Sequence, residues 1–94
     1  MKIHRQEKGK KGAFFIEEDG EWLAEMTYFR SGTRKIVVDH TEVSEKLKGK
    51  GAGKALVQAV VAFARKNNLL IKPVCPFAKK VLESSDEFED VLTR

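Results

Sequence analysis

The sequence contains one cysteine, two prolines and no long apolar run, and each of these shortages limits what the protein can be. Cys75 alone cannot form a disulfide within the chain, so we expect a reduced thiol and a cytoplasmic protein. No stretch approaches the roughly 20 apolar residues that span a bilayer. The N-terminal segment MKIHRQEKGKKGAFF has no continuous apolar run, so neither a membrane-spanning segment nor a secretory signal is expected.

Length and charge limit the number of domains and the kinds of partner that the protein can have. A chain of 94 residues is large enough for one hydrophobic core but not for two, so we predict a single domain over residues 1–94. Basic residues outnumber acidic ones by 18 to 14, which gives a net charge of +4. This balance favours anionic partners, such as nucleotide cofactors, nucleic acid or acidic surfaces, but does not choose among them.

The N-terminal half is predicted to be an antiparallel β-meander. Alternating apolar residues indicate strands over residues 3–8, 13–18, 21–30 and 34–43. Asp19-Gly20 is a strong signal for a tight hairpin turn between the second and third strands. Strict alternation in the fourth strand would place Ile36, Val38 and His40 on one face of the sheet.

The C-terminal half is predicted to be a β-α-β unit. Apolar residues recur at helical spacing from Gly51 to Asn67, and a short apolar strand follows over residues 69–75. Pro73 indicates an edge or a distorted strand, and a short helix is expected after Pro76. The fold class is therefore α+β: an antiparallel meander, then a parallel β-α-β unit with a short C-terminal helix.

Three features fall at the carboxyl ends of the two parallel strands, where ligands of such units bind. They are His40, Cys75 and the glycine-rich loop KGKGAGK over residues 48–54. A Walker A loop fails because Lys48 stands where glycine is needed and Ala55 replaces the hydroxyl that holds Mg²⁺. A G-x-G-x-x-G dinucleotide fingerprint fails as well. What remains is an anion site at a helix N-terminus, or else a flexible solvated loop.

Three motifs together resemble one known family. Lys48-Gly49-Lys50-Gly51-Ala52-Gly53 fills the Q/R-x-x-G-x-G/A pattern of the GNAT superfamily of N-acetyltransferases, with Lys48 where glutamine or arginine is usual. His40-Thr41-Glu42-Val43 and Cys75-Pro76-Phe77-Ala78 are similar to motifs that flank this loop in minimal, single-domain members. The resemblance covers roughly residues 13–92.

The resemblance implies acetyl-coenzyme A as co-substrate, no metal, and a fold in which the two parallel strands splay apart around the pantetheine arm. The pyrophosphate would meet the main chain of the glycine loop. The cofactor-binding residues that it implies are Val43, Lys48, Gly49, Lys50, Gly51, Ala52, Gly53 and Lys54.

The resemblance also implies two catalytic residues. His40 would be a base facing the acetyl group, and Cys75, lying across the strand gap from it, would be an acid or an acetyl acceptor. From the residues alone, the preferred interpretation of His40 is a satisfied strand histidine, and Cys75 has the alternative of a small core residue, the commonest fate of a free cysteine. Larger members use a tyrosine after the last core strand as general acid. The only tyrosine here, Tyr28, is expected in the core.

The predicted function is therefore transfer of an acetyl group from acetyl-coenzyme A to an unidentified amine by a monomeric protein. Two alternatives stay open. One is a protein that binds coenzyme A without turnover. The other is a basic nucleic-acid-binding module, which is disfavoured because the acidic residues are spread through the chain and no pair of stacking aromatic residues marks a strand.

Overall fold

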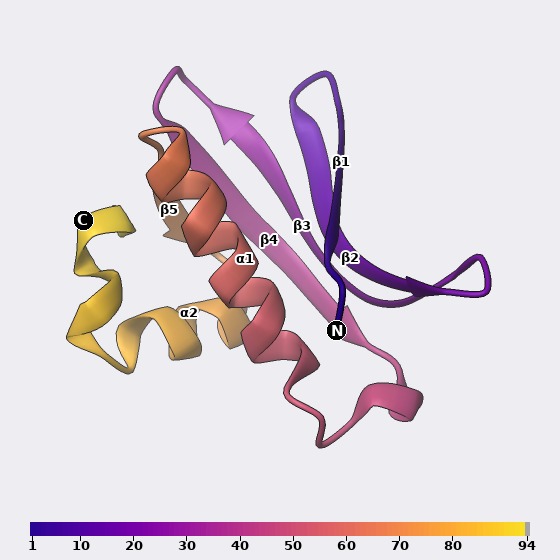
Figure 1. Cartoon of the computed structure of the whole chain (residues 1–94). Coiled ribbons are helices and arrows are strands. Elements are labelled where there is room, and N and C mark those ends of the chain that lie inside the picture. The colour runs from indigo at the N-terminus through magenta and orange to yellow at the C-terminus, as the bar shows by residue number, and fades with distance from the viewer. Residues whose placement is uncertain (94) are drawn as a thin grey trace.

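The computed structural model describes residues 1–93, which form a five-stranded sheet with helices packed on it (Figure 1). Its elements are β1 (His4–Lys8), β2 (Lys11–Glu18), β3 (Glu21–Ser31), β4 (Lys35–Val43), α1 (Ala52–Lys66), β5 (Leu70–Pro73) and α2 (Pro76–Glu83), with two 3-10 helices, η1 (Glu45–Leu47) and η2 (Asp86–Val91). Over residues 1–93, no helix combines the length and the apolar character needed to cross a bilayer.

The sheet has the strand order β1-β2-β3-β4-β5. The first four strands pair antiparallel, and β4 pairs parallel with β5. Asp19 and Gly20 both have positive φ, 52° and 80°, as expected for the hairpin turn between β2 and β3. The predicted meander and the predicted parallel unit are therefore both confirmed.

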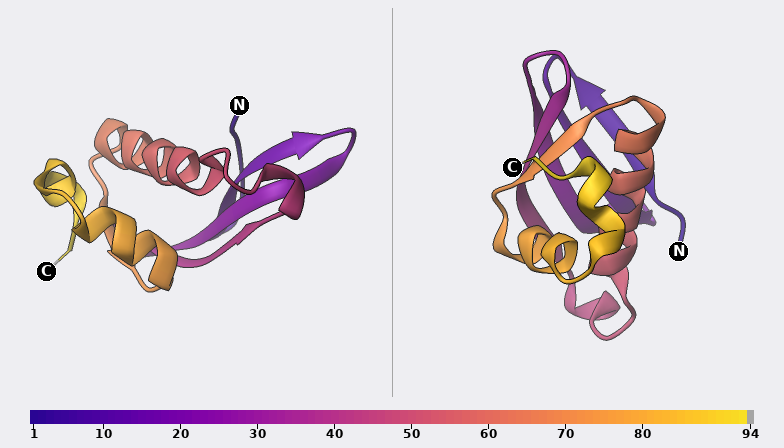
Figure 2. Two further views of the ribbon diagram at one scale, coloured as in Figure 1. Left: turned by 90° about the horizontal axis from the view of Figure 1, so that it is seen from below. Right: turned by 90° about the vertical axis from the view of Figure 1, so that its left-hand side faces the viewer.

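The core lies between α1 and one face of the sheet. Leu56, Val57, Val60 and Ala64 are at most 1% exposed, and they join strand residues and the inward side chains of α2 and η2 in one cluster. Figure 2 shows α1 along one side of the sheet, with α2 and the C-terminal segment beside it at the β5 edge. The opposite side of β1–β4, which we call the outer face, carries Ala13, Phe15, Thr27 and Val37 and has no helix from residues 1–93 against it.

A β-bulge in β4 changes which face His40 occupies. Thr27 lies opposite His40 and Tyr28 lies opposite Val38, so Asp39 has no partner of its own in β3. One extra residue shifts every later side chain of a strand to the other face. The prediction that Ile36, Val38 and His40 share a face is therefore wrong, because His40 lies on the outer face with Thr27.

The parallel strands separate just beyond this bulge. Their pairing runs from Lys35 with Leu70 to Val38 with Pro73, whereas β4 continues to Val43. The carbonyl of Val38 accepts hydrogen bonds from the N–H groups of both Val74 and Cys75, at 2.9 and 3.0 Å, as the chain turns away. The predicted splay is therefore present, and Pro73 is the last residue of β5.

Candidate functional site

Cys75 lies where the two parallel strands separate. It follows β5, is the N-cap residue of α2, and is only 5% exposed. Its thiol donates a hydrogen bond to the hydroxyl oxygen of Thr41, with 3.2 Å between Sγ and Oγ1. Thr41 belongs to the part of β4 that has no partner in β5, so the sulfur faces the gap between the strands.

The surroundings of Cys75 favour its thiolate. Burial raises the pKa of the thiol, but hydrogen bonding with the Thr41 hydroxyl and hydrogen bonds from the backbone N–H groups of Ala78, Phe77 and Thr41 together lower it by more. The N–H groups of Phe77 and Ala78 belong to the first turn of α2, where the helix dipole also favours negative charge. The pKa of Cys75 therefore lies below its ordinary value, as expected from its place at a helix N-terminus.

His40 does not share this environment. It is exposed on the outer face, opposite Thr27, while the residue that contacts Cys75 is Thr41. The neighbouring carboxylate of Asp39 accepts a hydrogen bond from the Thr27 hydroxyl at 2.6 Å. The structure thus puts the two expected catalytic side chains on different sides of β4.

Thr41 is the site residue that sequence reasoning missed. The sequence names it only as a member of the motif His40-Thr41-Glu42-Val43, with no role of its own. A hydroxyl residue directly after a histidine at a strand end was the available signal. The bulge at Asp39 places Thr41 on the same face of β4 as Val38, where it can contact Cys75.

The glycine loop forms an open cradle before α1. Gly49 and Gly51 both have φ of +76°, a conformation that other residues rarely adopt. A Cβ atom added at either glycine would meet no atom within 4 Å, so the main chain there is accessible. Gly51 is the N-cap of α1 and has no side chain to cap the helix.

The N–H groups of this loop are only partly engaged. Those of Lys48 and Lys50 donate to the carbonyls of Glu45 and Leu47, at 3.2 Å each. The N–H groups of the first turn of α1, from Ala52 to Lys54, have no intrahelical acceptor, as at the start of any α-helix. Together with the helix dipole, they give residues 51–54 the features that suit an anion, and the anion site stays a prediction.

The lysines around the loop differ in their freedom. Lys48 pairs with Glu45 at 2.9 Å, and Lys46 pairs with Glu21 at 3.5 Å. Lys50 and Lys54 make no ion pair with residues 1–93, so they are the cations available to an anion at this helix end.

A close contact joins the loop to the cysteine turn. The ring of Phe77, two residues after Cys75, lies against Gly53, and a Cβ atom at Gly53 would come within 2.5 Å of it. The N-termini of α1 and α2 are therefore side by side. Gly53 therefore leaves the space that the ring of Phe77, from the Cys75-Pro76-Phe77-Ala78 motif, occupies.

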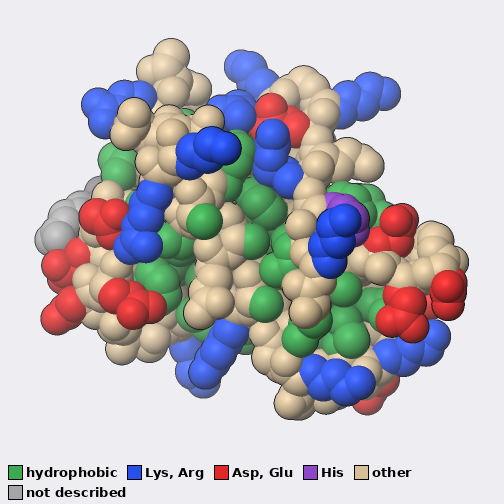
Figure 3. Space-filling view, in the orientation of Figure 1, with side chains coloured by type: hydrophobic (Ala, Val, Ile, Leu, Met, Phe, Trp, Pro, Cys, Tyr) green, Lys and Arg blue, Asp and Glu red, His purple; other side chains and the backbone are tan. Residues whose placement is uncertain are grey.

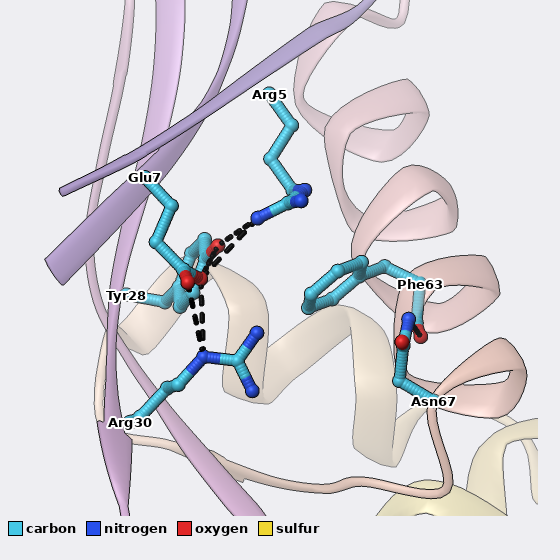
Figure 4. A network of polar contacts seen from close by, with 6 residues as sticks. All are labelled: Arg5, Glu7, Tyr28, Arg30, Phe63 and Asn67. Carbon is cyan, nitrogen blue, oxygen red and sulfur yellow. Dashed lines mark hydrogen bonds and ion pairs between the residues drawn. The ribbon is translucent and has the colours of Figure 1, made fainter. Parts of the chain in front are cut away.

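Tyr28 is structural, as the sequence indicated. Its side chain is 2% exposed, and its hydroxyl donates to Glu7 at 2.6 Å and accepts from Arg5 at 2.9 Å (Figure 4). Arg30 also binds the Glu7 carboxylate, and the guanidinium of Arg5 lies 4.4 Å from the ring centre of Phe63. This network fixes β1 and β3 against α1.

The fold and the sequence both have relatives among known proteins. Residues 13–91 match the GCN5-related N-acetyl-transferase family. A GCN5-like protein from Staphylococcus aureus, solved by NMR, is 42% identical, and the match covers 96% of this chain and 87% of that one with a TM-score of 0.74. Among proteins of curated function, none matches this sequence.

More distant structures share the fold alone. A ribosomal-protein-alanine N-acetyltransferase from Brucella melitensis biovar Abortus 2308 is 20% identical with a TM-score of 0.65, over 90% of this chain and 71% of that one. An aminoglycoside N-acetyltransferase in complex with CoA is 14% identical with a TM-score of 0.60, over 93% of this chain and 76% of that one. From the family match and the 42% identical relative, the chain belongs to the GCN5-related N-acetyltransferases.

Proposed function

We propose that the protein transfers an acetyl group from acetyl-coenzyme A to an amine, with the gap between β4 and β5 as its reaction site. One observation carries this proposal. The parallel ladder stops at Val38, and both Cys75 and the glycine loop lie at the open end. Family membership supports the same chemistry.

The residues at this end fit the acetyl donor. The open main chain at Gly49 and Gly51 and the free N–H groups of the first turn of α1 suit a pyrophosphate, with Lys50 and Lys54 adding charge. The part of β4 that ends at Val43 lacks a partner in β5, so its backbone groups can pair with the amides of a pantetheine arm. When bound, acetyl-coenzyme A supplies an activated thioester.

We favour direct transfer because it needs no contact between His40 and Cys75, which lie on different sides of β4. His40, on the outer face, removes the proton from the attacking amine. Cys75, in the gap, gives its thiol proton to the departing sulfur as the carbon–nitrogen bond forms and the carbon–sulfur bond breaks. The Thr41 hydroxyl and the N–H groups of α2 stabilise the Cys75 thiolate until solvent returns a proton.

Covalent transfer through acetyl-Cys75 is the rival mechanism. The lowered pKa of Cys75 favours it, since a thiolate is the nucleophilic form. It also needs a base beside the thiol, and the side chain found there is that of Thr41.

Intact mass spectrometry after incubation with acetyl-coenzyme A separates the two mechanisms. We expect no acetyl group on Cys75 while an added α-blocked lysine is acetylated. We expect Cys75→Ala to lower that rate by about 100-fold or more, the usual scale for loss of a proton donor. A hydroxylamine-labile acetyl group on Cys75 that forms and decays at the turnover rate would establish the covalent route. Unchanged turnover in Cys75→Ala would make Cys75 a packing residue.

Titration with coenzyme A tests the binding half of the proposal independently. The amide resonances of residues 51–54 should shift most, and replacing Gly51 by a bulky residue should weaken binding. Binding without acetyl transfer to any amine would identify a coenzyme A-binding protein. Binding of a nonspecific DNA duplex with no response to coenzyme A would favour a nucleic-acid module.

We propose a cytoplasmic monomer, which fractionation and sedimentation can test.

A further inference from the structure

The outer face of the sheet has two ends of opposite character. Cross-strand register assigns its positions row by row. The row nearest the turn between β1 and β2 contains Lys8, Lys11, Phe29, Val37 and Lys72. The next row contains Thr27 and His40. Beyond it, Glu25 lies directly opposite Glu42, and Trp22 lies opposite Glu17. We call the end that carries Glu17, Glu25 and Glu42 the acidic end, and it begins immediately beside His40.

Four carboxylates near this end make no ion pair within the described residues. Glu17, Glu25, Asp39 and Glu42 form no ion pair with any Lys or Arg of residues 1–93. Like charges directly opposite each other on a sheet are destabilising, so the Glu25–Glu42 pair costs the fold some stability. The protein as a whole is basic, with a net charge of +4, so this end of the outer face differs in sign from the net charge.

Aromatic side chains accompany the carboxylates. The rings of Trp22 and Phe15 stack with centroids 3.9 Å apart, and His4 stacks on the other side of Phe15 at 5.4 Å. Trp22, Glu25, Glu42 and Ser44 help to line a shallow hollow of about 220 Å³. An aromatic face beside two carboxylates suits an ammonium group, which gains both ion pairing and a cation–π contact.

We propose that the acidic end of the outer face docks an extended, lysine-containing peptide segment, and that the acetylated lysine lies beside His40. The inference rests on the proposed acetyl transfer and names its acceptor class. The hollow is partly open and its lining is as polar as it is apolar, unlike the enclosed, apolar pockets of small ligands, so it suits a side chain of a polypeptide. Because the net charge of the protein is +4, we expect local carboxylates such as these, and not the net charge, to attract the peptide.

The register also predicts the spacing of lysines in the acceptor. Glu25 lies two residues along β3 from Thr27, the residue opposite His40. Two residues of extended chain span about 6.6–6.8 Å and point to the same side. A second lysine two positions from the acetylated one therefore reaches Glu25 and Glu42, so the preferred sequence is lysine, any residue, lysine.

Fluorescence of Trp22, the only tryptophan, tests docking without any turnover. The probe is a terminally blocked pentapeptide with two lysines separated by one glycine, and its control has glutamine in place of one lysine. We expect Glu25→Gln/Glu42→Gln to weaken binding of the two-lysine peptide about 5- to 30-fold at low salt, the combined scale of two partly exposed charge pairs. The matched variant Glu83→Gln/Glu89→Gln removes the same charge from the helix side, where acidic residues gather over the C-terminal segment (Figure 3). It should bind the peptide as the unaltered protein does.

The outcomes separate docking from catalysis. Equal losses in the two double variants, or no loss in either, would overturn the docking surface. So would tighter binding of spermidine than of the peptide, which would assign the surface to a small polyamine. Peptide binding that depends on Glu25 and Glu42 without acetylation would uphold docking while refuting the proposed transfer. Acetylation of one- and two-lysine peptides at equal rates, unaffected by Glu25→Gln/Glu42→Gln, would uphold transfer and refute docking.

Discussion

Substitution of Gly53 by alanine tests the contact that joins the glycine loop to the cysteine turn. Gly53 is the second residue of α1, where alanine is favoured over glycine by about 1 kcal/mol. Against this gain, the new Cβ would come within 2.5 Å of the Phe77 ring. Overpacking of this kind costs about 1–3 kcal/mol. Since the Phe77 side chain is 39% exposed and can partly swing outward, we expect a net loss of about 1 kcal/mol.

A double-mutant cycle with Phe77→Ala makes the expectation sharp. Phe77→Ala alone should cost about 1–2 kcal/mol, because it removes a ring that is only partly buried. In that background the clash is gone, so Gly53→Ala should stabilise the protein by about 0.5–1 kcal/mol. The effect of Gly53→Ala on stability thus changes sign when Phe77 is replaced by alanine. Such a change is the mark of energetic coupling between residues in contact.

Urea unfolding followed by Trp22 fluorescence measures all four corners of this cycle. Gly51→Ala is the matched control. The φ of +76° at position 51 destabilises any residue other than glycine by about 1 kcal/mol, and a Cβ atom there would meet nothing within 4 Å. That loss should be the same with and without Phe77→Ala. If Gly53→Ala changes stability equally in both backgrounds, the steric link between the loop and the cysteine turn is refuted.

Three further expectations follow from contacts of single side chains. Thr41→Val removes the hydroxyl that stabilises the Cys75 thiolate, so the pKa of Cys75 should rise and the pH midpoint of its alkylation by iodoacetamide should move upward. Glu42→Gln relieves the repulsion with Glu25 and should stabilise the protein by about 0.2–1 kcal/mol in urea; destabilisation would contradict the like-charge argument. The hydrogen bond from the Tyr28 hydroxyl holds the pKa of Glu7 below 4.5, so its stabilising effect is present above that pH and is lost as the pH falls through the folded-state value; Glu7→Gln should flatten this acid-side loss in thermal melts.

Much of the fold was accessible from local patterns. The meander, the turn at Asp19-Gly20 and the helix that follows the glycine loop depend on periodicity and turn chemistry, which a sequence displays directly. Pro73 marked the irregular end of β5, and the structure ends the strand there. The family resemblance depended on three motifs close to one site, and residues 13–91 do match that family.

The orientation of the site residues was not accessible in this way. Strict alternation predicts His40 on the same face as Ile36 and Val38. One bulged residue, Asp39, reverses that assignment and brings Thr41 to Cys75. Nothing in the local sequence distinguishes a bulged strand from a regular one, because a bulge is set by pairing with the neighbouring strand. The contact between Gly53 and Phe77 was hidden for a similar reason, since it joins two helix ends that are distant in the chain.

The early end of the β4–β5 ladder has a consequence for the handling of the protein. Beyond Val38, β4 presents open backbone groups on the side that β5 has left, as an edge strand does. Such edges recruit strands from other molecules unless bulges and charges discourage them, and here the bulge at Asp39 and the charge of Glu42 do so. A ligand lying in the gap would cover the remaining groups. We therefore expect samples without coenzyme A to self-associate faster on warming, as light scattering would detect, and coenzyme A to protect them as a substitute for the missing strand.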